Sequence, residues 1–336
     1  TLGLNLGLGQ VSLGQNTATT LDWSGTKKLA LKVGATGQVD LNFSGQLLEV
    51  GGTMSVRVGD QLNASGSLMI SRQERDVVVG GRTIRAAGFV IGASNLQGSV
   101  AGVNLGGQGI DLALALMRPL NADAKDSRSW LALKARVDGL SLNAQQLGLP
   151  ADSLDIQADV ITLEANMALG ALSGVPATEV LDLGQTASAD RRIQVLTGQM
   201  ANNTPETIAL DFVGAGGAFL SLAMDAKISV AGSVLLQGTF GLARLGSRTV
   251  TLNDGNKRSM DVTMLSARNV SAQLGSGLGT DAFVGAMLSG ANLGLMVLTD
   301  QEGGGTFVGM RATGSSAALA GMSGLTLKGG MLSIGV

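Results

Sequence analysis

The sequence predicts an elongated all-β protein, a β-solenoid or β-roll-like stack of two divergent modules of about 170 residues each. Three observations lead to this fold class. Apolar and polar residues alternate along much of the chain, 51 of the 336 residues are glycine, and a stretch around Asn95 recurs around Asn269. Two successive β-sandwiches, one per module, are the alternative architecture.

Alternation predicts half-buried strands, because successive side chains of a strand point to opposite faces of its sheet. The segments with this pattern are Leu2–Leu8, Leu29–Val33, Val39–Phe43, Met54–Val58, Ile110–Leu116, Leu131–Val137, Leu220–Met224 and Leu325–Ile334. Helical periodicity is scarce, and short helices are expected only at Asn143–Leu154 and Val175–Gly184.

Turns between the strands are expected where glycine is concentrated, since glycine adopts the positive φ angles that tight hairpins require. The expected turns are Gly51–Gly52, Gly80–Gly81 and the segment Asn253–Asn256, which reads Asn-Asp-Gly-Asn.

The chain contains an internal sequence repeat, which we call the echo. The stretch GASNLQGSVAG at Gly92–Gly102 returns as SARNVSAQLGS at Ser266–Ser276, about 174 positions downstream. Neither stretch carries catalytic residue types, so a duplicated piece of scaffold explains the echo better than a duplicated active site. Further pairs occur in the same order: Leu21–Gly25 with Leu210–Gly214, Ser65–Arg72 with Gln237–Arg244, Gly109–Met117 with Gly290–Leu298, Ser129–Ala135 with Thr306–Ala312, and Leu154–Leu163 with Leu325–Ile334.

The echo predicts a division into modules. Residues 1–20 complete a preceding module, residues 21–200 form the first β-rich module, and residues 201–336 form the second, which is truncated at its C-terminal end. Neighbouring modules of the same longer chain are therefore the expected partners, and the sequence leaves a homopolymeric filament open. Trp23 and Trp130 align with Phe212 and Phe307, which predicts that matching large rings fill the cores of both copies.

Composition excludes several classes of function. The chain has no Cys, no His and no Tyr, which rules out disulfides, thiolate catalysis, histidine-based triads and ordinary zinc sites. A net charge of −2 gives no electrostatic footprint for nucleic acid. The apolar run Ala282–Thr299 just reaches membrane-spanning length, but Ser289, Gly290 and Asn292 interrupt it. Two strands and a turn are expected there, and no membrane span.

One segment resembles a calcium motif. Gly106–Leu114, GGQGIDLAL, fits the nonapeptide whose Asp binds calcium in parallel β-rolls, which makes Asp111 a weak calcium candidate. A single copy cannot supply ligands from two coils, so a glycine turn entering a strand is the simpler interpretation. No other metal site and no cofactor is expected.

The acidic residues also favour a structural interpretation. Asp155 and Asp159 alternate with Ile156 and Val160, which is typical of solvated strand positions, and Glu164 follows on the other face. Paired acids could serve glycoside hydrolysis, but only nine aromatic residues are available as sugar platforms. No residue is expected to be catalytic, and the chain is not expected to be an enzyme.

The amino-acid sequence of the two modules resembles a known group of proteins. The segments GIDLALALM, RSWLALKA and LDIQADVITLEAN, with GGGTFVGMRATGSSAALAGMSGLTLKGG in the second copy, resemble repeat modules of very large bacterial extracellular repetitive, adhesin-like proteins. The resemblance implies a segment of a giant extracellular or cell-surface fibre or adhesin-like stalk that works by end-to-end module stacking, with lateral assembly left open. It implies no catalytic residues. The alternative is a β-helix that binds or cleaves carbohydrate with carboxylates and calcium.

Overall fold

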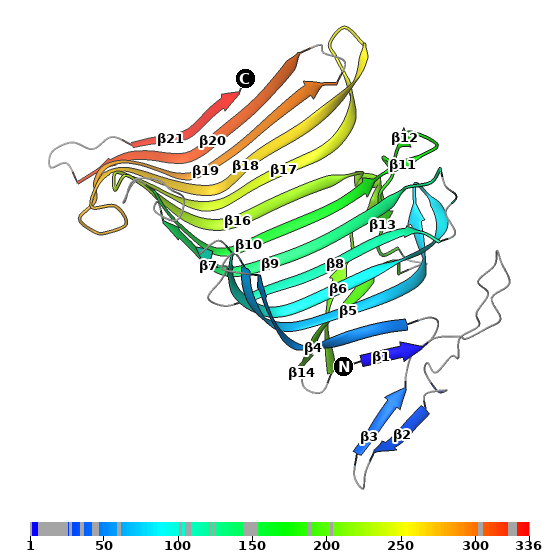
Figure 1. The fold of residues 1–336 in the computed structure, drawn as a ribbon. Helices are drawn as coiled ribbons and strands as arrows, with labels where there is room; N and C mark the ends of the chain where they lie inside the picture. The colour runs from blue at the N-terminus through cyan, green and yellow to red at the C-terminus, as the bar shows by residue number, and fades with distance from the viewer. Residues whose placement is uncertain are drawn as a thin grey trace.

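The protein is dominated by one large, bent antiparallel sheet, as Figure 1 shows for the computed structural model. The structure describes residues 2–5, 26, 29–33, 37–41, 47–58, 62–100, 103–104, 109–120, 123, 125–143, 154–186, 190–201, 204–301, 305–321 and 328–335. In the sheet, strands follow one another in the order β1-β4-β5-β6-β8-β9-β10-β16-β17-β18-β19-β20-β21. The expectation of an all-β protein is confirmed.

The strands of this sheet are unusually long, many of them exceeding 15 residues. Those on the main path are β1 (Leu2–Asn5), β4 (Leu47–Val58), β5 (Leu62–Val79), β6 (Arg82–Val100), β8 (Gly109–Pro119), β9 (Ser129–Asn143), β10 (Leu154–Leu169), β16 (Phe219–Val230), β17 (Val234–Thr251), β18 (Lys257–Ser276), β19 (Val284–Asp300), β20 (Thr306–Ala320) and β21 (Lys328–Gly335). The remaining elements are β2 (Leu29–Val33), β3 (Gly37–Leu41), β7 (Val103–Asn104), β11 (Ala171–Leu172), β12 (Val175–Pro176), β13 (Leu181–Asp182), β14 (Ile193–Ala201), β15 (Thr204–Leu210) and the 3-10 turn η3 (Gly214–Gly216).

The pairing differs from the expected architectures. Strands on the path pair antiparallel with their neighbours, as in a meander, whereas successive coils of a β-solenoid pair in parallel; no solenoid coil is identified in the described part of the chain. Two separate sandwiches are also wrong, because β10 and β16 pair along their length, from Leu154 with Val230 to Asn166 with Phe219. One sheet therefore runs through both copies of the echo.

The echoed segments lie on strands that occupy the same positions in two successive sets of six. We name β4, β5, β6, β8, β9 and β10 the first strand set, and β16 to β21 the second strand set. The echoes place β5 with β17, β6 with β18, β8 with β19, β9 with β20, and β10 with β21.

The most similar pair of repeated segments forms a bend in the sheet in both strand sets. Asn95 in β6 and Asn269 in β18 both adopt positive φ, 56° and 50°, at breaks in the strand register. The backbone N–H of Asn95 donates to Oδ1 of Asp111 at 3.1 Å, and that of Asn269 donates to Oδ1 of Asn292 at 3.1 Å. Asparagine tolerates the left-handed conformation, and a bulge of this kind bends a strand. The repeated sequence segment therefore forms the same β-bulge in both strand sets.

A glycine faces each bulge from the neighbouring strand. A Cβ atom added to Gly66 would lie 2.9 Å from Cα of Leu96, and one added to Gly238 would lie 2.9 Å from Cα of Val270. Real Cβ atoms do not approach backbone this closely, so both positions need glycine for close contact between strands.

A separate segment covers half of one sheet face. We name the described residues between Ala171 and Val213 the plug; they contain β11 to β15, with β14 and β15 paired as a hairpin. The plug packs mainly on strands β5, β6, β8 and β9, and it also contacts β4 and β10. The main core consists of Val77, Val79, Ala86, Val90, Ala113, Ala115, Met117, Trp130 and Ala132 of the sheet, with Leu181, Leu183, Ile193, Val195, Leu210 and Phe212 of the plug.

The local elements agree with the sequence in part. Gly80–Gly81 forms the expected turn with φ of 56° and 76°, and Asn253–Asn256 connects β17 to β18. Gly51–Gly52 does not form a turn but lies inside β4. The helix expected at Val175–Gly184 is wrong, because Leu181 and Leu183 alternate into the core as strand residues do. Residues 144–153 of the other expected helix lie outside the described residues.

Residues 284–299 of the apolar run lie in one strand, β19, instead of two strands and a turn. The interruption predicted at Gly290 is a local irregularity, with φ of 60°, within this strand. In the part of the chain that the structure describes, no helix has the length and apolarity to cross a membrane.

The bulge glycine gives a first test. Replacing Gly238 with Ala should lower the free energy of unfolding by about 1–3 kcal/mol, because the new methyl group must displace the backbone of β18. Gly309→Ala is the matched control, since nothing lies within 4 Å of a Cβ at that position, and should stay within about 0.5 kcal/mol. Urea unfolding monitored by circular dichroism measures both. Equal effects of the two substitutions would contradict the assigned role of Gly238.

Candidate assembly surface

The most distinctive surface is a face of the sheet that is covered in one half and open in the other. We name the face that contacts the plug the plug face. Strand register carries it from the first set into the second, because Ala132 pairs with Asn166 and Asn166 pairs with Phe219. The row continues through Leu245, Val262, Leu298 and Phe307.

Residues at equivalent positions differ sharply in exposure. Val90, Ala115 and Trp130 of the first set are 2%, 0% and 0% exposed. Their counterparts by the echo, Met264, Met296 and Phe307, are 40%, 39% and 39% exposed. The expectation that Phe307 fills a core as Trp130 does is therefore wrong, because no described segment covers it as the plug covers Trp130. Trp23, the partner of Phe212 in the alignment, lies outside the described residues.

A small cluster at the hairpin end of the second set is nevertheless buried. Met260, Val262 and Leu298 pack there, with Leu245, Val250 and Leu252 around them. We name the exposed remainder of the plug face in the second set the open face; it comprises Met264, Met296, Phe307 and Arg311, with Leu298 at its buried border. Adjacent exposed large apolar side chains of this kind mark interaction surfaces more often than scattered single ones do.

In the first set, a lysine anchors the plug. Lys134 Nζ lies 2.9 Å from Oδ1 of Asp211 and 5.6 Å from the ring centre of Phe212, over its face. Phe212 is itself buried and meets Phe219 edge to face at 5.3 Å between ring centres. An ion pair and a cation–π contact therefore act on two adjacent plug residues.

Two buried hydrogen bonds fix the plug from the sheet side. Trp130 Nε1 donates to the carbonyl oxygen of Glu179 at 3.0 Å, and Asn166 Nδ2 donates to the carbonyl oxygen of Leu181 at 2.8 Å. Buried polar groups are costly without a partner, so these bonds specify where the plug backbone runs. Sequence patterns alone could not reveal this, because Asn166 resembles any polar strand residue.

Arg311 occupies in the second set the position of Lys134 in the first. Ser129–Ala135 and Thr306–Ala312 are echoed segments, and each cation follows its aromatic residue by four positions. Lys134 faces Glu164 across the strands, with 3.7 Å between Nζ and Oε1. Arg311 is exposed and faces Gly294 and Gly335 instead. Among the described residues it has no ion pair.

Ion pairs also close the plug on itself. The Arg192 side chain donates to Asp190, with 2.7 Å between Nη2 and Oδ2, and lowers the pKa of Asp190 to about 2. Desolvation acts to raise the pKa of Asp182, but the backbone N–H groups of Gly214 and Gly184 and the Arg191 guanidinium outweigh it and hold that pKa below its usual value.

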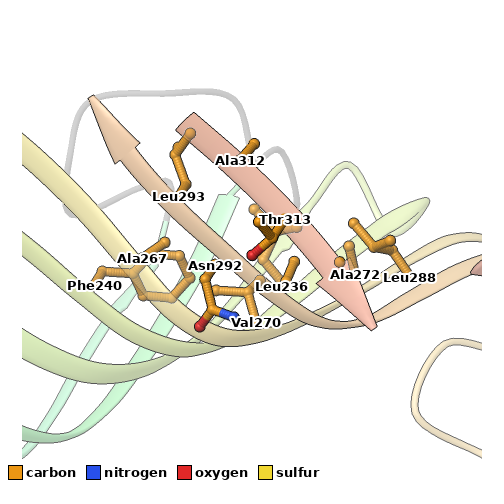
Figure 2. Close-up of a pocket in the computed structure, with 12 residues that line it drawn as sticks. Leu236, Phe240, Ala267, Val270, Ala272, Leu288, Asn292, Leu293, Ala312 and Thr313 are labelled. Atoms are coloured by element: carbon orange, nitrogen blue, oxygen red, sulfur yellow. The ribbon is translucent and has the colours of Figure 1, made fainter. Parts of the chain in front are cut away.

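The opposite face carries an apolar hollow of about 410 Å³ at the bulge of the second set, as Figure 2 shows. Phe240, Val270, Leu288 and Leu293 contribute most of its apolar wall. Asn292, which accepts the Asn269 N–H, is its polar element together with Thr313. The hollow follows from the bend, and it contains no charged side chain.

The predicted metal candidate has a structural partner. Asp111 accepts the backbone N–H of Asn95, which is the role that neutral Asn292 plays in the second set. Among the described residues no group of three or more acidic side chains could hold a metal ion. Glu164 lies near Lys134, Asp155 accepts a bond from Gln157, and Asp126 pairs with Arg128. The structure does not bring these carboxylates together.

Comparison with known proteins adds no assignment. No protein-family model matches the chain, and neither a curated protein nor a solved structure matches it. The functional conclusion therefore depends on the geometry.

The difference in cover predicts unequal substitution effects at equivalent positions. Trp130→Ala should cost about 3–5 kcal/mol of unfolding free energy, because it leaves a cavity beneath the plug and an unpaired Glu179 carbonyl. Phe307→Ala should cost less than about 1.5 kcal/mol in dilute solution, since that ring is already 39% exposed. Urea unfolding of both variants at low protein concentration measures the difference. Equal losses would show that the open face is covered.

Acid should loosen the plug over a defined range. A carboxylate whose pKa is lower in the folded state stabilises the fold above its unfolded pKa, and this stabilisation is lost as the pH falls through the folded value. For Asp190 the range runs from 3.8 down to about 2. The protection factors of the β14 amides, which correct for the pH dependence of intrinsic exchange, should fall on acidification through this range.

Asp190→Asn is the control for the acid effect, because it removes the titrating group. The variant should lose part of the pH dependence of β14 exchange, while a dependence identical to that of the unmodified chain would contradict the role of this pair.

Proposed function

We propose that the chain is a structural repeat segment of a giant bacterial extracellular or cell-surface fibre or adhesin-like stalk. It works by joining modules end to end through strand pairing, and it is not an enzyme. The modules are residues 21–200 and 201–336, with residues 1–20 completing a preceding one. Neighbouring modules of the same longer chain are the partners, and filaments of identical chains are the assembled form.

The observation that carries the proposal is the pairing of β10 with β16. β10 ends the first strand set and β16 begins the second, and their pairing makes a continuous sheet. The contact between sets is mainly backbone hydrogen bonding, which tolerates divergence of side chains. A long series of dissimilar modules can therefore use the same joint.

The two ends of the sheet can repeat this joint. β21 corresponds to β10, and among the described strands it pairs only with β20. β4 corresponds to β16, and β1 pairs with only its first part, Leu47–Val50. Edge strands of this kind are templates for pairing with another chain.

The fibre's location is supported by the resemblance of the repeated segments to extracellular repeat proteins, and the lack of Cys is compatible with an oxidising exterior. A soluble array without disulfides must gain its stability from continuous sheet pairing and from covered modules.

Carbohydrate binding or cleavage with calcium is the less supported function. Asp126, Asp182 and Asp190 each pair with an arginine, and the apolar hollow beside Phe240 has one aromatic ring and no carboxylate. A glycosidase would need two carboxylates facing each other across a groove.

Negative-stain electron microscopy tests the proposal. The 13 strands of the path span about 60 Å at roughly 4.8 Å per strand. We expect ribbons that lengthen with protein concentration in steps of that size. Single particles of constant size at all concentrations would contradict end-to-end joining.

Proline substitutions on β21 sharpen this experiment. Leu332→Pro and Ser333→Pro, made separately, remove backbone donors that point to opposite sides of the strand. The one that removes an outward donor should shorten the ribbons without lowering the urea midpoint of the single chain.

A further inference from the structure

We propose that the open face binds a segment of the form Leu-Asp-aromatic-x-Gly, and that the segment bound is Leu21–Gly25 of a second copy of this chain. The inference rests on the proposed function, because it names the side-chain contact that accompanies end-to-end joining. It assigns the receptor to Met264, Met296, Phe307 and Arg311.

The first strand set shows how such a segment is held. Leu210 is fully buried, Asp211 pairs with Lys134 at 2.9 Å, and Phe212 is buried under the Lys134 ammonium. Three consecutive plug residues thus supply an apolar anchor, a negative charge and a ring. A tight complex needs this combination of buried anchors and a matched charge.

The open face offers the complementary groups, and no described segment occupies it as the plug occupies the first set. Arg311 is the cation, and no described carboxylate pairs with it. Phe307 and Met296 provide the apolar surface that Trp130 and Ala115 provide in the first set. A guanidinium binds a carboxylate in a bidentate manner, so the exchange of Lys134 for Arg311 keeps the charge preference.

The sequence contains a second segment of the same form. Leu21-Asp22-Trp23-Ser24-Gly25 repeats the order of Leu210-Asp211-Phe212-Val213-Gly214. Leu21–Gly25 lies outside the described residues, and its assignment as the occupant rests on this sequence match. Tryptophan is a strong anchor at interfaces, because it buries a large ring at low entropic cost.

Chain order favours a second copy as the source. Leu210–Gly214 directly precedes β16, the strand that pairs with β10. Leu21–Gly25 precedes β4, which corresponds to β16; β4 lies next to the terminal strand β1, at the end of the sheet opposite β21 in Figure 1. In sequence order, Leu21–Gly25 stands before a β4–β21 joint between two copies as Leu210–Gly214 stands before the β10–β16 joint within one chain. Such a head-to-tail contact does not close and builds filaments.

A charge exchange tests the contact. Arg311→Glu and Asp22→Arg should each weaken self-association of the full chain at least about tenfold, measured by sedimentation velocity, because each places like charges together. The double variant D22R/R311E should recover most of the association, and an equimolar mixture of the two single variants should also associate. Arg244→Glu, the same change on the opposite face, should leave association unchanged.

Wild-type association that is insensitive to Arg311→Glu, or a double variant no better than the single ones, would overturn the docking assignment. A chain that remains monomeric at every concentration in sedimentation would overturn it as well, unless the peptide below binds.

A peptide of residues 17–28 separates this inference from the proposed function. The fluorescence anisotropy of the peptide should rise when the wild-type full chain is added. The affinity of the peptide for R311E should be at least about tenfold lower than for wild type. Peptide binding without ribbons in the microscope would keep the docking site and reject the fibre. Ribbons without Arg311-dependent peptide binding would keep the fibre and reject the docking site.

Discussion

The constraint on which the structure depends is that an antiparallel sheet with an apolar face needs a cover. Packed between sheet and plug, Trp130, Met117 and Leu210 lose all contact with water. Burial of this kind is the main favourable term in folding. In the second strand set the same face continues, yet Met264, Met296 and Phe307 remain exposed. The two halves therefore share a scaffold and differ in what covers it, and the function proposed for the chain follows from this difference.

The bend is the second shared feature, and it explains why an unremarkable stretch of sequence is repeated. An asparagine in the left-handed region, an oxygen acceptor on the next strand and a glycine opposite form one bulge in β6 and again in β18. The acceptor is charged in one copy and neutral in the other, so geometry rather than metal chemistry explains the position of Asp111. The apolar hollow beside Phe240 is a consequence of the same bend.

Much of the local structure could be predicted from the sequence, and the long-range pairing could not. Alternation identified strands such as Leu131–Val137, and glycine pairs identified the turn at Gly80–Gly81. The strands of a solenoid coil and of a meander show the same alternation, so the topology predicted from the sequence was wrong. The site could be predicted only in part. The alignment of Trp130 with Phe307 identified equivalent positions, but their burial depends on the plug, whose path is set by contacts such as the hydrogen bond from Asn166 to Leu181. The role proposed for Arg311 could be inferred only from the structure, which shows that Lys134 at the equivalent position pairs with Asp211.

The most direct measurement of the central claim is hydrogen–deuterium exchange of β9 and β20 as a function of protein concentration. The two strands have equal length and equivalent positions, and of the two only β9 lies beneath a plug formed by described residues. The account predicts that β20 exchanges faster than β9 at high dilution and approaches the protection of β9 as chains associate. Equal protection at high dilution, or exchange in β20 that does not change with concentration, would contradict it.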